Sequence, residues 1–359
     1  MINWYRSSIN PPYSRKDLPA LIGTFFVLLI PLAITLLLVQ FNYFEKTKPQ
    51  KLQYREEADS FVFTSSGDFG ANSDTEMVLE AIADSGSRFH LALGDLSYSQ
   101  IKPEAAWCDF VKSKVGAAFP FQLVTGNHED NGPDGDINKF AQCLPNKVKG
   151  LIGNYAKEYY FDYKYLARFI LISPNLNLDG KSYDYNVGNP HYDWVVNAID
   201  SARSANIPWV IVGMHKNCIT MGAKTCEVGT DLINMLIEKR VDLILQGHEH
   251  NYQRSRQLKC ASADSYKDYC VDGSGDNRSY VKGLGSILVI AGTSGRSLTN
   301  IDTADYEAGY FAKWSGKNIN PSQGTLKFTV SRKQIFYQFV SISLGQFGDS
   351  FTISNNVPE

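Results

Sequence analysis

The sequence predicts an α/β fold, and three observations support this class. From residue 61 onward, apolar strand-like runs alternate with stretches of helical spacing, which indicates a largely parallel sheet covered on both faces. Near the end of the chain, strands follow one another through short polar connections, so we expect a second, partly antiparallel sheet packed on the first. Hydrophobic residues make up 43% of the 359 residues and charged residues 20%, a balance typical of a globular protein with a substantial core.

The expected elements follow from local patterns. Strands are short runs rich in β-branched and aromatic residues, and helices are longer segments with apolar residues three or four positions apart. In chain order, we expect strands of the first sheet at residues 61–64, 89–93, 121–125, 169–172, 209–212 and 241–245. The helices between them are expected at residues 74–83, 104–115, 194–202 and 232–239. The strands assigned to the second sheet are residues 287–291, 325–330 and 334–340.

The N-terminal region differs from the rest of the chain. Residues 18–39 form a stretch of 22 residues without a charge. At a helical rise of about 1.5 Å per residue this stretch spans roughly 33 Å, enough for a bilayer core of about 30 Å. It is longer than the apolar part of a signal peptide, and no small-x-small cleavage site follows it. We therefore expect a transmembrane anchor at residues 18–40 that contacts the lipid bilayer, with a cleaved signal peptide as the alternative.

The remaining boundaries follow from composition. A short N-terminal tail at residues 1–17 precedes the anchor, and the polar, charged residues 41–57 are typical of a juxtamembrane stalk. We assign residues 58–345 to one large globular domain and residues 346–359 to a C-terminal tail. The formal net charge is only -2, from 35 Lys plus Arg and 37 Asp plus Glu. Such a chain has no overall field to hold a phosphate backbone, so we expect no nucleic-acid partner.

The cysteines bear on the compartment. There are six, and two pairs are close enough in sequence to close small loops: Cys218 with Cys226, and Cys260 with Cys270. Six reduced cysteines are the alternative, whereas the absence of a CxxC motif gives little support to a structural zinc site. A sequon begins at Asn277, which is weak evidence for glycosylation. We expect at least one disulfide and a single-pass membrane protein whose large C-terminal domain, residues 58–345, lies outside the cytoplasm.

Five of the expected strands end in a glycine followed by a side chain that can bind a metal. Ligands in open α/β sheets lie beyond the carboxyl ends of the strands, and glycines allow the sharp turns needed there. Taken singly, each pattern is more often a turn or a packed histidine. Four of the six histidines occur in these segments, however, while His90 and His191 lie outside and are expected to be structural. The five segments begin at Gly67-Asp68, Gly94-Asp95, Gly126-Asn127-His128, Gly213-Met214-His215 and Gly247-His248-Glu249-His250.

These five segments, in this order, resemble the calcineurin-like metallophosphoesterase superfamily over roughly residues 61–295. The resemblance implies a four-layered α/β/β/α sandwich around a centre of two metal ions. Most of that superfamily has Asp-x-His in the first motif, but here the third position is Gly70. Tyr98 follows Asp95 by three residues, which is similar to the purple acid phosphatase branch, where a tyrosinate coordinates a ferric ion. An ordinary packed tyrosine is the alternative for Tyr98.

The resemblance also implies a ligand set. The first metal would be held by Asp68, Asp95, Tyr98 and His250, and the second by the bridging Asp95 together with Asn127, His215 and His248. Carboxylates and a phenolate suit Fe³⁺, whereas imidazoles and an amide oxygen suit a divalent ion such as zinc, manganese or iron. In the same family His128 would face the substrate and act as the catalytic residue. It would stabilise the transferring phosphoryl group or protonate the leaving oxygen.

The expected function is therefore that of an acid phosphatase-like hydrolase of phosphoric esters. It would be a membrane-tethered phosphatase that hydrolyses small phosphate monoesters by attack of a metal-bound hydroxide. Glu129, Asn251 and Arg254 are candidates for contacting the substrate or orienting ligands, with a structural role at least as well supported. A phosphodiesterase or nucleotidase on the same centre is the first alternative. An inactive binding module anchored at the surface is the second.

Overall fold

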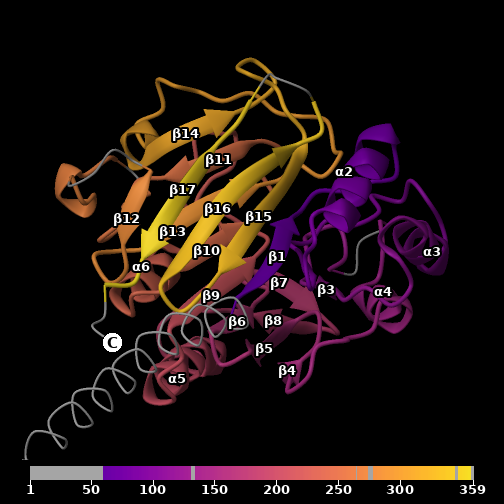
Figure 1. Ribbon diagram of the computed structural model, residues 1–359, viewed down its shortest axis with the longest axis horizontal. Coiled ribbons are helices and arrows are strands. Elements are labelled where there is room, and N and C mark those ends of the chain that lie inside the picture. Colours follow the sequence, from indigo (N-terminus) through magenta and orange to yellow (C-terminus); the bar gives the residue numbers. More distant parts are fainter. Residues whose placement is uncertain (1–59, 131–133, 264, 274–277, 344–346, 357–359) are drawn as a thin grey trace, which may run out of the picture. The chain divides into compact units, whose positions relative to one another are not determined.

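A computed structural model describes residues 60–130, 134–263, 265–273, 278–343 and 347–356 (Figure 1). The expected anchor at residues 18–40, the tail before it and the stalk after it lie outside these residues. Within the described part of the chain, no helix has the length and apolar character needed to cross a bilayer.

The described residues form two large mixed sheets. The first sheet has seven strands, in the spatial order β12-β17-β16-β15-β1-β2-β3. They are β1 (Phe61–Ser66), β2 (His90–Ala92), β3 (Phe121–Leu123), β12 (Ser279–Val281), β15 (Gly324–Val330), β16 (Gln334–Ser341) and β17 (Ser350–Ser354). Strand β1 runs parallel to β2 and antiparallel to β15, with Thr64 opposite His90 and Phe61 opposite Val330.

The second sheet has eight strands, in the order β14-β11-β13-β10-β9-β6-β5-β4. They are β4 (Ile152–Asn154), β5 (Glu158–Tyr163), β6 (Ala167–Leu171), β9 (Trp209–Met214), β10 (Leu243–Gln246), β11 (Tyr252–Ser255), β13 (Ile287–Ala291) and β14 (Phe311–Ser315). Its centre, β6, β9, β10 and β13, is parallel, and its margins are antiparallel. A small hairpin stands apart from both sheets and consists of β7 (Leu176–Leu178) and β8 (Lys181–Tyr183).

The two sheets enclose an aromatic core. Phe63 of the first sheet stacks on Phe89 and Phe328, with ring centroids 5.6 and 4.7 Å apart, and meets Phe169 of the second sheet edge-on at 4.9 Å. All four rings are fully buried. This packing fixes the two sheets face to face, because large aromatic side chains bury much apolar area and prefer stacked or edge-on contacts.

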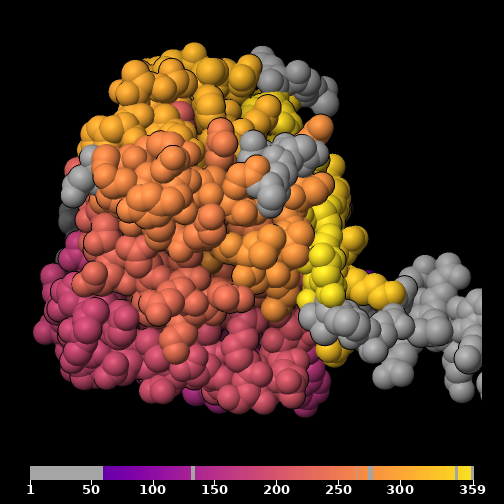
Figure 2. Space-filling view, turned by 90° about the vertical axis from the view of Figure 1, so that its left-hand side faces the viewer, coloured from indigo at the N-terminus to yellow at the C-terminus, as the bar shows by residue number. Residues whose placement is uncertain are grey.

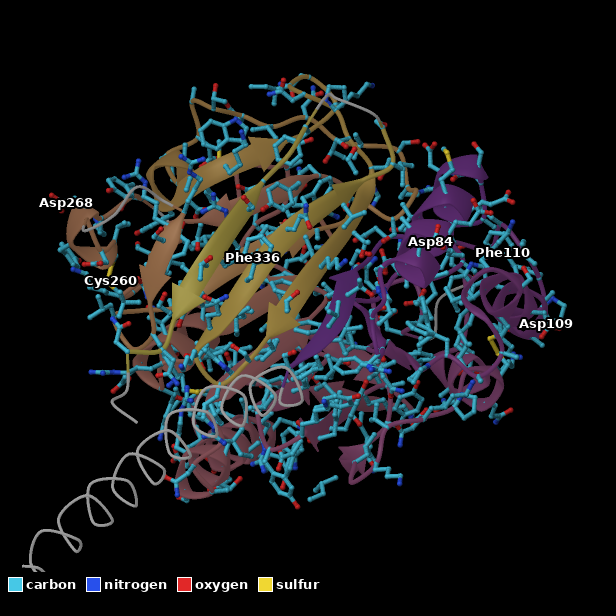
Figure 3. All side chains as sticks on the ribbon, viewed as in Figure 1. Asp84, Asp109, Phe110, Cys260, Asp268 and Phe336 are labelled. Atoms are coloured by element: carbon cyan, nitrogen blue, oxygen red, sulfur yellow. A yellow bond between two sulfur atoms is a disulfide. The ribbon has the colours of Figure 1, made fainter. Side chains whose placement is uncertain are left out.

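Helices cover the outer faces of the sheets (Figure 1). Buried side chains of α2 and α3, such as Val78 and Trp107, join Ala92 of the first sheet in one cluster, and Ile199 of α5 joins Val212 of the second. The described helices are α2 (Ser73–Asp84), α3 (Glu104–Val115), α4 (Ile137–Cys143), α5 (Pro190–Ser204) and α6 (Thr230–Glu238), with short 3₁₀ turns at η1 (Asp268–Cys270) and η2 (Ala308–Tyr310). Beyond the helices the first sheet meets solvent: Phe336 of β16 is 39% exposed (Figure 3).

Two sheets are present, as expected, but the expected assignment of strands to a largely parallel first sheet and a partly antiparallel second sheet is wrong in part. The parallel strands are split, with β1 to β3 in the first sheet and β6, β9 and β10 in the second. Residues 287–291, assigned to the antiparallel sheet, form β13 and pair in parallel with β10. Alternating strands and helices predict parallel pairing but not which strands are neighbours. The continuous burial of β13 on both faces is the property of a central parallel strand.

The C-terminal boundary also needs correction. Residues 346–359 were expected to be a tail, but β17 (Ser350–Ser354) pairs antiparallel with β16 and parallel with β12. Phe351 and Ile353 alternate with half-exposed residues and are buried, which is the period-2 pattern of a half-buried strand. Figure 2 shows this yellow segment lying against the orange part of the chain. The folded domain therefore extends beyond residue 345.

The expectation of at least one disulfide is confirmed. Three disulfides join Cys108 to Cys143, Cys218 to Cys226, and Cys260 to Cys270, and no described cysteine is free. The first ties α3 to the end of α4. The second closes a loop after β9, and the third closes the loop that carries η1, where Figure 3 labels Cys260.

Candidate metal centre

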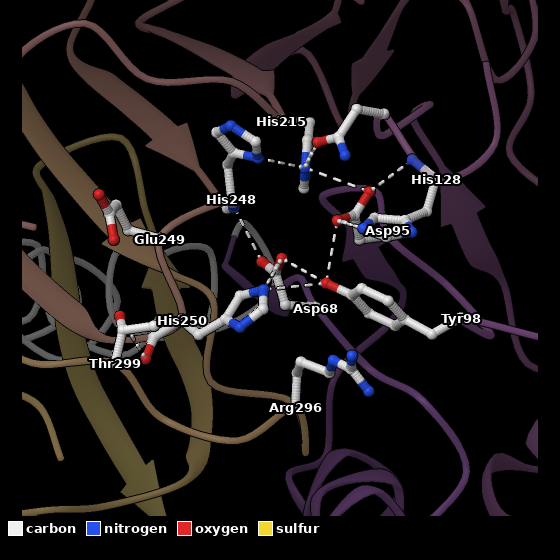
Figure 4. Close-up of polar contacts among 12 residues, drawn as sticks. Asp68, Asp95, Tyr98, His128, His215, His248, Glu249, His250, Arg296 and Thr299 are labelled. Atoms are coloured by element: carbon white, nitrogen blue, oxygen red, sulfur yellow. Dashed lines mark hydrogen bonds and ion pairs between the residues drawn. The ribbon is translucent and has the colours of Figure 1, made fainter. Parts of the chain in front are cut away.

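The side chains singled out from the sequence converge at the carboxyl ends of strands from both sheets (Figure 4). The first sheet contributes the residues that follow β1, β2 and β3, namely Asp68, Asp95, Tyr98, Asn127 and His128. The second sheet contributes the residues that follow β9 and β10, namely His215, His248 and His250. The carboxyl ends of parallel strands meet at a common edge, so segments almost 200 residues apart come together.

Tight turns aim these side chains inward. Asp68, Asp95, Tyr98 and His248 all have left-handed backbones, with φ between 49° and 70°. A non-glycine residue in this region costs free energy, and such residues concentrate at functional sites. At Gly94, with φ 83°, a Cβ atom would lie only 2.6 Å from the backbone nitrogen of Gly126. Glycine is therefore required where the two turns cross.

One group surrounds the Tyr98 hydroxyl. Its oxygen lies 2.9 Å from Asp68 Oδ1, 2.9 Å from Asp95 Oδ2 and 3.0 Å from His250 Nε2. Potential ligand atoms of Asp68, Asp95 and His250 also lie within 4.8 Å of one another. One hydroxyl proton cannot serve two carboxylates at once, so this group has more acceptors than donors and is suited to a cation.

A second group surrounds His215 and shares Asp95 with the first. His215 Nε2 lies 3.2 Å from Asp95 Oδ1, 3.1 Å from Asn127 Oδ1 and 3.1 Å from His248 Nδ1. The other ring nitrogen of His215 lies 2.7 Å from the carbonyl oxygen of Leu93. A carbonyl only accepts, so Nδ1 keeps its proton, and Nε2 is the nitrogen that loses its proton and becomes a ligand when a cation binds.

His248 is oriented in the same way by Glu227. Its Nε2 lies 2.7 Å from Glu227 Oε1, so Nε2 donates and the Nδ1 lone pair faces His215. Lys216 forms an ion pair of 2.9 Å with the same carboxylate. Lone pairs of two imidazoles, an amide and a carboxylate thus converge on one point, and that donor set fits a divalent transition metal. Sequence reasoning missed Glu227 because it belongs to no motif.

In the absence of metal, burial and neighbouring charges shift the pKa values of the site residues in opposite directions. Burial raises the pKa of Asp68, but the hydrogen bond from His250 and the charge of His215 outweigh it and hold the pKa below its usual range. Burial lowers the pKa of His215, but the charge of Asp95 outweighs it and raises the pKa to about 9. Burial and the charges of Asp68 and Asp95 raise the pKa of Tyr98 well above its ordinary value. A phenolate at this position therefore requires a strongly charged cation.

The position of Gly70 explains the missing histidine of the first motif. Gly70 has φ 91°, and a Cβ atom there would lie 2.8 Å from Gln100 Oε1. That oxygen accepts a hydrogen bond of 2.6 Å from the backbone of Ala71. A histidine at position 70 would have to displace the Gln100 side chain. The first ligand group therefore lacks a histidine from this motif, and the Tyr98 hydroxyl lies in that group instead.

His128 lies at the edge of the site and is partly exposed, at 32% of its side chain. Its Nδ1 lies 2.6 Å from Asp134 Oδ2, which is itself fixed by Ser99. Its Nε2 lies 3.7 Å from Asp95 Oδ2 and faces the two groups. The carboxylate of Asp134 therefore orients the ring so that Nε2 is directed at the two ligand groups. Asp134 is a second residue that sequence reasoning missed.

The three adjacent candidates lie inside the protein. The Glu129 carboxylate accepts hydrogen bonds from the backbone of Asp95 and Leu96 and so holds the second turn. Asn251 is fully buried, and its side-chain oxygen accepts a hydrogen bond from Gln253. Arg254, 2% exposed, forms an ion pair of 2.6 Å with Asp349. These contacts give all three a structural explanation, while His90 and His191 lie in β2 and α5, as expected of structural residues.

Comparison with known proteins identifies the class to which this fold and site belong. The sequence profile of the calcineurin-like phosphoesterase family matches residues 62–252, and the chain belongs to this family. Several of its relatives are purple acid phosphatases. The chain is 24% identical over 310 residues to a probable inactive purple acid phosphatase 24 of Arabidopsis thaliana, covering 80% of this chain and 46% of the relative. It is 25% identical over 217 residues to the Fe(3+)-Zn(2+) purple acid phosphatase 12 of the same plant, covering 55% and 44%.

A solved structure shows the same fold. The purple acid phosphatase PPD1 from yellow lupin seeds has 20% sequence identity and a TM-score of 0.62, covering 82% of this chain and 54% of the lupin chain. The chain spans about half the length of these relatives.

Proposed function

We propose that this protein is a two-metal phosphomonoesterase of the acid phosphatase type. The observation that carries the proposal is the pair of ligand groups that share Asp95. One consists of Asp68, Asp95 and His250 around the Tyr98 hydroxyl, and the other of Asp95, Asn127, His215 and His248. Metal ions that share a carboxylate lie close enough to clamp one phosphoryl group.

The donor sets assign different metals to the two groups. The first group offers two carboxylates and a phenol against one imidazole, a set of hard oxygen atoms that suits Fe³⁺. The second offers two imidazoles and an amide oxygen besides the shared carboxylate, which suits a divalent ion such as zinc, manganese or iron. The name of the Fe(3+)-Zn(2+) relative supports this assignment.

When bound, the two metal ions would polarise the phosphoryl group and activate water for in-line displacement. The chain's own residues supply the remaining steps. Asp134 holds His128 through Nδ1, so the opposite nitrogen is free to donate a proton to the leaving oxygen of the ester. Glu227 and the carbonyl of Leu93 keep the imidazoles of the second group in the tautomers that leave their lone pairs inward.

The membrane anchor and the compartment belong to the same proposal. Residues 18–40 would hold the protein in the bilayer with the catalytic domain outside the cytoplasm, and the uncharged stretch at residues 18–39 supports this. The three disulfides in the described residues support it as well, because disulfides persist mainly in oxidising compartments.

An inactive binding module is the competing function, because several relatives carry the word inactive in their names. The protein keeps a complete set of seven inward-facing ligands, which a binding module does not need. We therefore favour an active enzyme.

A direct test uses the whole protein in detergent. Metal content is measured and the hydrolysis of p-nitrophenyl phosphate and bis-p-nitrophenyl phosphate is followed side by side. We expect about two metal ions per chain and faster cleavage of the monoester. Faster cleavage of the diester would favour the phosphodiesterase, and metal-free protein without hydrolysis would favour the binding module.

A further inference from the structure

Arg296 lies beside the candidate metal centre, and its guanidinium has no polar partner among the described residues. Its guanidinium carbon is 4.3 Å from the centroid of the Tyr98 ring (Figure 4). The side chain is half-buried. No hydrogen bond or ion pair joins the guanidinium to any residue that the structure describes. A planar cation with five N–H donors is thus held near the site by stacking alone.

The backbone of Arg296, by contrast, is fixed. Its N–H donates to the carbonyl oxygen of Asp68 at 3.0 Å, and its carbonyl accepts from Gln323 Nε2 at 2.7 Å. Two residues before Arg296, the Ser294 N–H donates to the carbonyl oxygen of Gly67 at 3.1 Å. Three residues after it, the Thr299 N–H donates to the carbonyl oxygen of His250 at 2.8 Å. The backbone from which the side chain extends is therefore fixed in position, while the guanidinium has no hydrogen-bond acceptor among the described residues.

The neighbours of Arg296 explain why an acceptor is lacking. The nearby carboxylates, Asp68 and Asp95, already contact the Tyr98 hydroxyl and histidine nitrogens, and both are fully buried. Figure 4 shows Arg296 on one side of the Tyr98 ring and His128 on the other. His128 is itself close to that ring, with centroids 4.3 Å apart. Two groups that can donate to an anion thus flank Tyr98.

We propose that Arg296 is a substrate-binding residue that donates to a phosphoryl oxygen of the ester. The inference rests on the proposed function, because it places a phosphate dianion at the metal centre. Arginine suits the role because its planar fork can donate two parallel hydrogen bonds to a phosphate. Stacking on Tyr98 restricts the fork before the substrate arrives, which reduces the entropy lost on binding.

The test compares Arg296→Ala and Arg296→Lys with the metal-loaded wild type. Inorganic phosphate is the probe, and its dissociation constant is measured by isothermal titration calorimetry. For Arg296→Ala we expect weakening by about 10- to 100-fold, the range for losing a hydrogen bond between charged groups. The KM for p-nitrophenyl phosphate should rise more than kcat falls. The lysine variant should recover part of the loss, since it keeps the charge but not the fork.

Arg332→Ala is the matched control. Arg332 is exposed on the turn after β15. Val330 pairs with Phe61, the first residue of β1, so this turn lies near the start of β1, whereas Asp68 follows the end of β1. This variant should bind phosphate like the wild type.

The outcomes separate the two claims. Wild-type protein that neither binds metal nor hydrolyses the ester would refute the proposed function, and this inference with it. Active wild type with an Arg296→Ala variant that binds phosphate equally well would refute the inference alone. Loss of bound metal in Arg296→Ala would also refute it, because Arg296 would then serve to hold Tyr98 rather than the substrate.

Discussion

The two sheets make different contributions to the metal centre. Every oxygen ligand comes from a loop after β1, β2 or β3 of the first sheet, and every imidazole ligand follows β9 or β10 of the second. Neither sheet carries a complete site for either metal. The first group takes only His250 from the second sheet, whereas the second group takes both His215 and His248.

On the proposed assignment, this difference would allow two unlike ions to bind at one seam between the sheets. Hard oxygen donors outnumber nitrogen in the first group, and the donors are balanced in the second. Because each group spans both sheets, metal binding is linked to the packing of Phe63 and its neighbours between them.

The largest expected effect is on catalysis by a residue of the first sheet that holds no metal. His128→Ala should lower kcat by about 10²–10⁴, the range for losing a positioned acid or base, and both metals should remain bound. Kinetics and metal analysis of the same preparation check this. His191→Ala is the control, because His191 lies in the first turn of α5 and pairs with Glu158 instead of with a residue of the candidate metal centre. Loss of metal from His128→Ala would show that the role assignment is wrong.

A smaller effect should be confined to the second group. Glu227→Gln removes the charge that fixes His248 through Nε2, and such outer contacts are worth about 10- to 100-fold in metal affinity. We expect the divalent ion to be lost first during dialysis against a chelator, while iron stays. The exposed Glu238 at the end of α6 provides a control in Glu238→Gln. Equal loss of both metals would argue against separate groups.

The smallest effect concerns the stability of the first sheet in acid. Burial lowers the pKa of His90 on β2 to about 3, below its ordinary value of about 6.5. The unfolded chain therefore binds a proton between these values while the folded protein does not, so stability falls as pH decreases below about 6.5.

The change from pH 7 to pH 5.5 should cost about 1.4 kcal/mol. His90→Phe keeps the stacking on Phe121 but cannot titrate. The difference in its free energy of unfolding in urea between pH 7 and pH 5.5 should therefore lack the contribution of His90. Identical pH dependence in wild type and variant would contradict the buried, neutral histidine.

The sequence predicted which polar side chains lie together better than it predicted the neighbours of each strand. Glycine-linked ligands at strand ends are local patterns, and the rule that strand ends share an edge is enough to bring Asp68 and His250 together. Strand neighbours depend instead on contacts far apart in sequence. For that reason, the pairing of β13 with β10 and of β17 with β16 was not foreseen.

Supporting residues were missed for the same reason. Glu227, Asp134 and Arg296 belong to no motif, and each acquires its role only from a partner distant in the fold or in a neighbouring loop. The pairing of Cys108 with Cys143 likewise depends on α3 and α4 being neighbours, which no sequence spacing indicated.

The central claim is that Tyr98 and the carboxylates of the first sheet bind Fe³⁺ while the second sheet supplies the imidazoles for a divalent partner. The most direct measurement is the visible absorption spectrum of the whole protein, recorded with its metal content for wild type and Tyr98→Phe. We expect wild type to contain iron and to be coloured by charge transfer from the phenolate, and the variant to fold but lose the colour. A colourless wild-type protein with a full complement of iron under oxidising conditions would contradict the account.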